Sequence, residues 1–111
     1  MASISNLYID AGSTFSAIIS VSGTSGTPLN LTGYTVASQI RKSYGSITVY
    51  AFTSTIYDAV TGKVRLVLSS TTSSSIKPGR YLYDIEVTSP SNEKLRVVEG
   101  LVIITPEITK I

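Results

Sequence analysis

Short segments in which apolar and polar residues alternate run along most of the chain, with turn residues between them. The clearest segment is 80–87, where one set of side chains shares a face: Tyr81, Tyr83, Ile85 and Val87. A period of two indicates a strand with one buried face. Alternation and turn signals together predict strands over residues 4–9, 14–22, 34–41, 47–53, 55–57, 63–68, 80–87 and 94–105.

The segments between these strands carry residues that favour tight turns. Asp58 to Gly62 is typical of a hairpin connection in which glycine supplies a positive φ. Residues 69–77 are a run of hydroxyl side chains, which suits one capped helical turn or a loop before Pro78 and Gly79. Many short strands without a long helix predict an all-β, Ig-like antiparallel β-sandwich of about 7–8 strands.

We expect the sandwich to cover residues 1–105, with residues 106–111 forming a C-terminal tail or docking arm. No internal repeat and no second domain is evident. The alternation assigns the core to one side of each strand, and the inward set is Phe15, Ile19, Val36, Ile40, Leu66, Leu68, Tyr83, Ile85, Val97 and Leu101.

Composition narrows the function classes further. The chain has 111 residues, of which 42% are hydrophobic and 14% charged, so it is too apolar to be disordered. Its net charge is +2 and its basic residues are spread along the chain, which argues against nucleic-acid binding. The longest apolar run, Leu101 to Ile104, is strand-sized, so no membrane span is expected. The first residues show no secretory signal pattern, so synthesis in a cytoplasm is expected.

The chain contains no histidine and no cysteine, so the most common general base and the best thiol nucleophile are absent. Asp84 and Glu86 share one strand face about 7 Å apart, a spacing that would suit an inverting glycosidase. Arg41 and Arg65 lie on strands that could pair with them, which favours cross-strand ion pairs instead. Asp58 is the one carboxylate in its loop, too few for a calcium site. We expect no enzymatic activity, no metal and no cofactor.

Seven tyrosines raise the possibility of a carbohydrate-binding platform. Tyr81 and Tyr83 are expected to point inward with their hydroxyls hydrogen-bonded. The candidates for exposure are Tyr8, Tyr44, Tyr50 and Tyr57. Tyrosine is also enriched at protein interfaces, so exposure alone leaves both alternatives open.

The last predicted strand is apolar on both faces in its second half. One face belongs to the core, and the other is expected to meet a sheet partner, a neighbouring subunit or the folded-back tail. The candidate interface is therefore Leu101, Val102, Ile103, Ile104, Ile108 and Ile111.

The sequence contains an ordered series of short motifs: Gly33-Tyr34, Gln39-Ile40-Arg41, Thr61-Gly62, Pro78 to Ile85, and Val98-Glu99-Gly100. Together these motifs resemble a small β-sandwich module of tailed-bacteriophage virions. The module is similar to baseplate upper protein N-terminal domains and to head decoration (cement) proteins.

The resemblance implies a non-enzymatic virion structural protein, first of all a capsid decoration (cement) protein acting by adhesion. Its partners would be other virion proteins, either the major capsid protein or tail and baseplate proteins, with self-association possible. One alternative is a tail, neck or baseplate adaptor. The other, from a different class, is a carbohydrate-binding module for host attachment.

Overall fold

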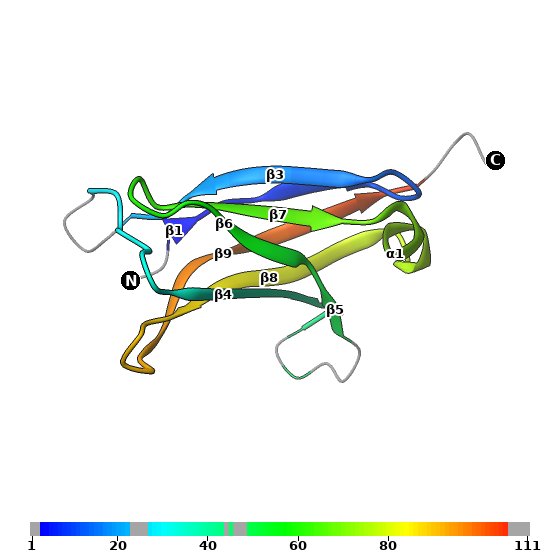
Figure 1. The fold of residues 1–111 in the computed structure, drawn as a ribbon. Coiled ribbons are helices and arrows are strands. Elements are labelled where there is room, and N and C mark those ends of the chain that lie inside the picture. The colour runs from blue at the N-terminus through cyan, green and yellow to red at the C-terminus, as the bar shows by residue number, and fades with distance from the viewer. Residues whose placement is uncertain (1–2, 23–26, 44, 46–48, 107–111) are drawn as a thin grey trace.

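The computed structural model describes residues 3–22, 27–43, 45 and 49–106, which form two stacked β-sheets (Figure 1). The elements in chain order are β1 (Ser3–Ile4), β2 (Leu7–Asp10), β3 (Phe15–Ser20), β4 (Thr35–Arg41), β5 (Val49–Ala51), β6 (Thr53–Asp58), β7 (Lys63–Leu68), α1 (Ser70–Ser75), β8 (Gly79–Thr88) and β9 (Lys94–Thr105). The large sheet has the order β1-β9-β8-β4-β5, with β2 also beside β9, and the small sheet has the order β3-β7-β6. The predicted all-β sandwich is confirmed.

The chain crosses from one sheet to the other at positions that the sequence pattern predicted only in part. Residues 47–53 were expected to be one strand, but β5 lies in the large sheet and β6 in the small one. The buried ring of Phe52 stands between them, where the chain crosses from one layer to the other. The hydroxyl-rich run forms α1, which links β7 to β8 and is capped by Ser69, whose side chain accepts from the Thr72 N–H at 3.2 Å.

The N-terminal segment runs parallel to β9, whereas the other paired strands are antiparallel. The predicted strand over 4–9 is interrupted at Ser5 and Asn6, and its two pieces continue along the same side of β9. Three bonds hold the interruption in place: Ser5 N–H donates to the Glu99 carbonyl, the Asn6 side-chain oxygen accepts from the Leu101 N–H, and the Tyr83 hydroxyl donates to the Ser5 carbonyl. Consequently β9 is an interior strand of the large sheet.

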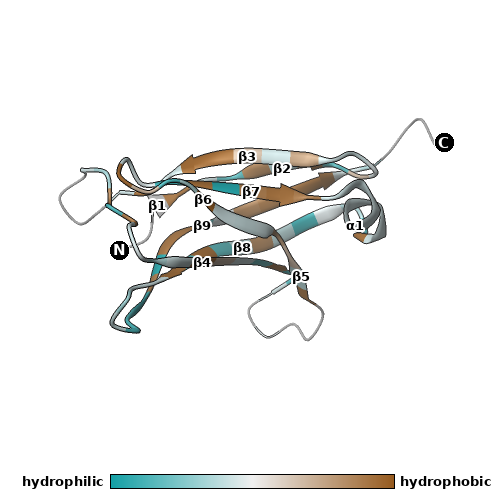
Figure 2. Ribbon diagram, in the orientation of Figure 1, coloured by the Kyte–Doolittle hydropathy of each residue, from teal (hydrophilic) through white to brown (hydrophobic). Residues whose placement is uncertain are grey.

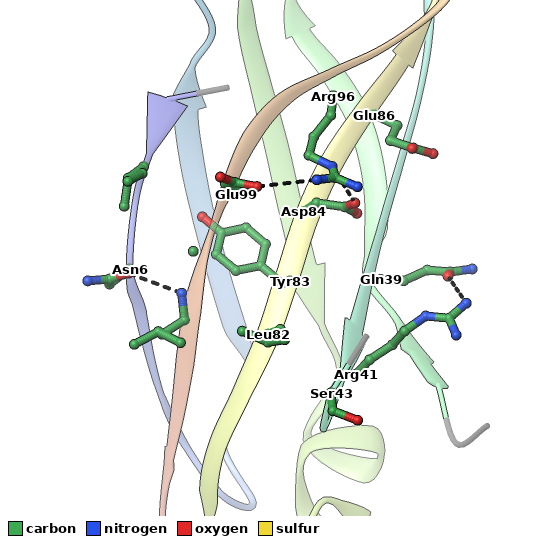
Figure 3. A pocket seen from close by; sticks show the side chains of 13 residues that line it. Asn6, Gln39, Arg41, Ser43, Leu82, Tyr83, Asp84, Glu86, Arg96 and Glu99 are labelled. Atoms are coloured by element: carbon green, nitrogen blue, oxygen red, sulfur yellow. Dashed lines mark hydrogen bonds and ion pairs between the residues drawn. The ribbon is translucent and has the colours of Figure 1, made fainter. Parts of the chain in front are cut away.

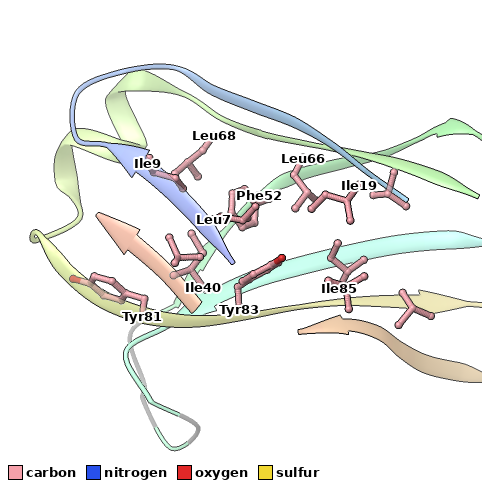
Figure 4. Close-up of a cluster of buried hydrophobic side chains, with 14 of the residues drawn as sticks. Leu7, Ile9, Ile19, Ile40, Phe52, Leu66, Leu68, Tyr81, Tyr83 and Ile85 are labelled. Carbon is pink, nitrogen blue, oxygen red and sulfur yellow. The ribbon is translucent and has the colours of Figure 1, made fainter. Parts of the chain in front are cut away.

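The core fills the space between the sheets (Figure 4), and Figure 2 shows hydrophobic stretches on the strands, such as β3 and β9, with hydrophilic segments on β7 and β8. Most of the expected inward set is buried, namely Ile19, Ile40, Leu66, Leu68, Tyr83, Ile85 and Val97. Phe15 and Val36 are partly buried and pack against this cluster. The alternation therefore placed the core correctly on four of the strands, β3, β4, β7 and β8.

Leu101 is the exception, because β9 contains a β-bulge. Ile85 lies opposite Val98 but Glu86 lies opposite Arg96, so Val97 is an extra residue in β9. An extra residue reverses the inside–outside alternation of everything that follows it. The expectation that Leu101 points into the core is therefore wrong, and Val102 and Ile104 occupy the inner face instead.

Candidate functional site

The outer face of the large sheet is hollowed into a groove of about 510 Å³ (Figure 3). Four segments that are distant in the sequence line this groove: the N-terminal segment, β4 together with Ser43, β8 and β9. The lining residues are Ile4, Asn6, Gln39, Arg41, Ser43, Leu82, Tyr83, Asp84, Glu86, Arg96, Glu99, Gly100 and Leu101.

An ion-pair cluster crosses this groove between β8 and β9. Arg96 Nε lies 3.2 Å from Asp84 Oδ2, and Arg96 Nη1 lies 3.3 Å from Glu99 Oε2. Arg96 and Glu99 are three residues apart, so strict alternation would put them on opposite faces of the sheet. The bulge at Val97 brings both onto the outer face, where Glu99 lies directly opposite Asp84. The cluster is thus a product of the backbone irregularity.

Of the two cross-strand partners expected for Asp84 and Glu86, Arg41 lies on β4, which pairs with β8, whereas Arg65 lies on the other sheet. Arg65 lies in β7 of the small sheet, where its Nε donates to the Ser16 hydroxyl at 3.2 Å, so the pairing considered for it is wrong. Arg41 lies opposite Leu82, and its Nη2 donates to the Gln39 side-chain oxygen at 3.3 Å. Arg96, which the alternation did not single out, is the cation that contacts Asp84.

The pKa of the Asp84 carboxyl is raised above its ordinary value. Burial is the largest influence and raises the pKa of this carboxyl, and the negative charge of Glu86 raises it further. The nearby Arg96 and Arg41 lower it in part, without reversing the direction. Burial therefore makes the ionised Asp84 carboxylate less stable than it would be in water, and an incoming hydrogen-bond donor or cation would stabilise it.

An apolar band adjoins the charged cluster on the same face. We define it as Ile4, Tyr8, Leu82, Leu101 and Ile103. Tyr8 lies opposite Ile103, and Leu101 lies opposite Leu82, so the band crosses three neighbouring strands. Ile4 is 77% exposed and Tyr8 71% exposed, while the other three side chains are partly buried. Apolar groups beside a satisfied ion-pair cluster are typical of a surface that contacts another macromolecule.

The interface residues expected from the sequence are divided by this arrangement. Leu101 and Ile103 lie in the apolar band, whereas Val102 and Ile104 are buried in the core. Ile108 and Ile111 lie outside the described residues, so the docking arm over residues 106–111 stays a prediction. Ile4 and Tyr8 were not assigned to this surface, because only the parallel pairing with β9 brings them there.

The tyrosines of the described part of the chain follow the expected division except at Tyr50, which packs against the core. The hydroxyl of Tyr81 donates to the Lys77 carbonyl, and both Tyr81 and Tyr83 are buried. Tyr8 and Tyr57 are exposed but lie on different sheets, so they do not form a shared platform. Tyr50 is partly buried, and Tyr44 lies outside the described residues.

Within residues 3–22, 27–43, 45 and 49–106, no helix is both long enough and apolar enough to cross a membrane. The same residues contain no group of three or more carboxylates placed to hold a metal ion.

Comparison with known proteins gives little that bears on function. No protein-family model matches the sequence, and no curated protein matches it. Among solved structures, the fold is similar to a family 123 glycoside hydrolase from Clostridium perfringens, with a TM-score of 0.44 and 10% sequence identity. The match covers 97% of this chain and 24% of that protein, so the chain spans about a quarter of its length. A likeness this weak carries no argument about activity.

Proposed function

We propose that the chain is a non-enzymatic structural protein of a tailed-bacteriophage virion, in the first place a capsid decoration (cement) protein. In this proposal the outer face of the large sheet adheres to neighbouring virion proteins. The observation that carries it is the apolar band, in which Ile4 and Tyr8 present large apolar side chains to solvent beside the groove. The resemblance of the motif series to phage β-sandwich modules supplies the partner class.

The energetics of such a contact are favourable on this face. Burying apolar surface contributes about 25 cal/mol per Å², so covering Ile4 and Tyr8 would stabilise a complex with a shell subunit. The Asp84–Arg96–Glu99 cluster would act mainly on orientation, because charges at the border of an interface select partners more than they add affinity. A cement protein that binds across subunit boundaries in this way would help a shell resist internal pressure.

The chemistry of the groove supports a role without catalysis. A glycosidase needs two carboxyl groups on opposite sides of the scissile bond. Asp84 and Glu86 instead lie two residues apart on one face of β8, and Arg96 Nε lies 3.2 Å from the Asp84 carboxylate. The sequence also contains no histidine and no cysteine that could take over acid–base or nucleophilic work.

The proposal is tested by adding the purified chain to phage particles that lack it and measuring its incorporation. Ile4→Lys and Tyr8→Lys are the informative variants, because both side chains are largely exposed and their replacement should leave the fold intact. Tyr57→Lys, on β6 of the small sheet, is the matched control. We expect at least a tenfold loss of incorporation for the first two variants and none for the control.

Immunogold labelling of intact virions then distinguishes a head position from the alternative of a tail, neck or baseplate adaptor.

A truncated chain tests the predicted C-terminal docking arm. A chain that ends at Thr105 should fold but be incorporated into particles less well if the arm contributes to binding. If the full-length chain never co-purifies with particles, the virion proposal is wrong.

One observation keeps the carbohydrate-binding alternative as a second candidate. Amide, guanidinium and carboxylate groups of Gln39, Arg41 and Glu99 line the groove next to the apolar side chains of Leu82 and Leu101. Such a combination can hydrogen-bond sugar hydroxyls while covering a sugar C–H face. Binding of host polysaccharide that Gln39→Ala weakens and Thr55→Ala leaves unchanged would favour this candidate over adhesion to virion proteins.

A further inference from the structure

Among the described residues β3 is an outer strand of the small sheet, and the strand itself carries none of the features that usually protect such an edge. Protection comes from short length, charge, proline or a bulge. Among the described strands, β5 has three residues, the N-terminal segment is broken into pieces of two and four, and β6 has a bulge and ends at Asp58. β3 has six residues in unbroken register with β7 and contains no charged residue and no proline.

The backbone of β3 offers a regular set of hydrogen-bonding groups on its outer side. Val21 N–H donates to the Gly62 carbonyl at 2.7 Å, next to the last residue of the β3–β7 ladder. Hydrogen-bonded and non-hydrogen-bonded positions alternate along an antiparallel pair. The odd-numbered residues therefore bond to β7, and Ser16, Ile18 and Ser20 direct their N–H and C=O groups away from it.

The side chains of these three residues form a symmetric pattern on the outer face of the small sheet. Ser16, Ile18 and Ser20 are all exposed, with a hydroxyl on each side of a central isoleucine that is 49% exposed. The inward positions Phe15, Ala17 and Ile19 are apolar and partly or fully buried. The strand therefore reads the same in both directions around Ile18 on its outer face.

We propose that β3 pairs antiparallel with β3 of a second copy of this chain, with the two-fold axis at Ile18. Antiparallel pairing keeps side chains of one face opposite each other, so only registers that match even with even residues preserve the alternation. The register centred on Ile18 pairs Ser16 with Ser20 of the second copy and uses all three free backbone positions on each chain. A shift by two residues would leave one of the three without a partner.

The side chains that meet in this register are compatible. Ile18 contacts its own counterpart, Ala17 lies opposite Ile19, and Phe15 lies opposite Val21, so apolar groups meet apolar groups on the inner face. Because β3 itself carries no charge, no like charges lie directly opposite each other across the new strand pair, which would be destabilising. The nearby cations Arg65 and Lys63 belong to the adjacent strand β7, and the Arg65 Nε donates to Ser16 at 3.2 Å. The two small sheets become one six-stranded sheet, and the large-sheet groove of each copy stays accessible. This inference does not depend on the virion role proposed above.

Sedimentation over a range of protein concentrations tests the pairing with two matched variants. Ile18→Lys would set two ammonium groups opposite each other on the two-fold axis and should abolish the dimer. Thr55→Lys places the same charge on an exposed position of the same sheet, on β6 at the far edge. We expect dimers for the wild type and for Thr55→Lys, and monomers for Ile18→Lys with an unchanged circular dichroism spectrum.

Cysteine cross-linking tests the register. Because the chain contains no native cysteine, any disulfide must form between the introduced residues. In a hydrogen-bonded antiparallel pair the Cα atoms are about 5.5 Å apart, within the range that a disulfide spans. Ile18→Cys should therefore form a covalent dimer on oxidation. Ser16→Cys alone should not, because the two copies of residue 16 would be about 13 Å apart along the strands. Ser16→Cys combined with Ser20→Cys should cross-link again.

Three outcomes would overturn the proposal. The first is a wild-type chain that stays monomeric at every concentration. This outcome overturns the proposal even if β3 pairs with a strand of another protein. The second is a dimer that survives Ile18→Lys. The third is a covalent dimer with Ser16→Cys but not with Ile18→Cys.

Discussion

Val97 and Val98 are neighbours in the chain, yet both side chains point into the core, with 6% and 1% of their surfaces exposed. Regular strand geometry forbids this, because successive side chains point to opposite faces. The bulge between β8 and β9 permits it and reverses the faces of every residue from Val98 onward. The candidate groove and its ion-pair cluster both depend on this reversal.

The consecutive pair Ile103 and Ile104 tests the reversal directly. Ile104 is buried, so Ile104→Ala should lower the free energy of unfolding by about 2–5 kcal/mol. Ile103 lies in the apolar band on the outer face, so Ile103→Ala should cost clearly less. Chemical denaturation of both variants provides the comparison. A larger loss for Ile103→Ala would mean that the strand follows the uninterrupted alternation.

Gly100 is expected to be required for the parallel N-terminal strand. A Cβ at this position would collide with the carbonyl group of Ser5, with its carbon only 2.8 Å away. Gly100→Ala should therefore displace β1 and cost about 1–3 kcal/mol of unfolding free energy. Gly45→Ala is the control, because nothing lies within 4 Å of a Cβ there and its φ is not positive. Equal stability of the two variants would argue against the close approach of Ser5 to β9.

The hydroxyl of Tyr83 holds the residues between β1 and β2 in place, because it donates a 2.6 Å hydrogen bond to the Ser5 carbonyl. Tyr83→Phe should cost about 0.5–1.5 kcal/mol, and it should speed hydrogen exchange of the Ser5 and Leu101 amides. Tyr81→Phe loses a bond of the same length to Lys77, four residues away, and should leave that exchange unchanged. Identical exchange in both variants would contradict a role for Tyr83 in holding the N-terminal segment.

Replacing Asp84 should not weaken the fold at neutral pH, although Asp84 forms an ion pair. Its pKa is raised, chiefly by burial and then by Glu86, so the ionised form is disfavoured in the folded state. A raised folded pKa contributes stability below the unfolded value of about 3.9 and loses it as the pH rises through the folded value. Relative to Asp84→Asn, the wild type should therefore lose unfolding free energy over this window and change no further above it. If the wild type instead gained stability over Asp84→Asn with rising pH, attraction by Arg96 would outweigh burial.

Local patterns were sufficient for much of the fold. The inward positions of β3, β4, β7 and β8, such as Ile19, Ile40, Leu66 and Ile85, follow from a period of two that each strand carries by itself. The hairpin at Gly62, with a φ of 71°, and the capped turn after Ser69 follow from residue preferences over a few positions. The sequence therefore determined the all-β class and most of the core.

The outer face of the large sheet was decided only by the tertiary structure. Val97 and Val98 are both apolar, so the sequence fits either register of β9, and the choice depends on how β9 pairs with β8. The approach of Ile4 and Tyr8 depends likewise on a parallel pairing between the two ends of the chain. Both features arise from backbone contacts between distant segments, which leave no period in the sequence, and together they place Arg96, Glu99 and the apolar band on one surface.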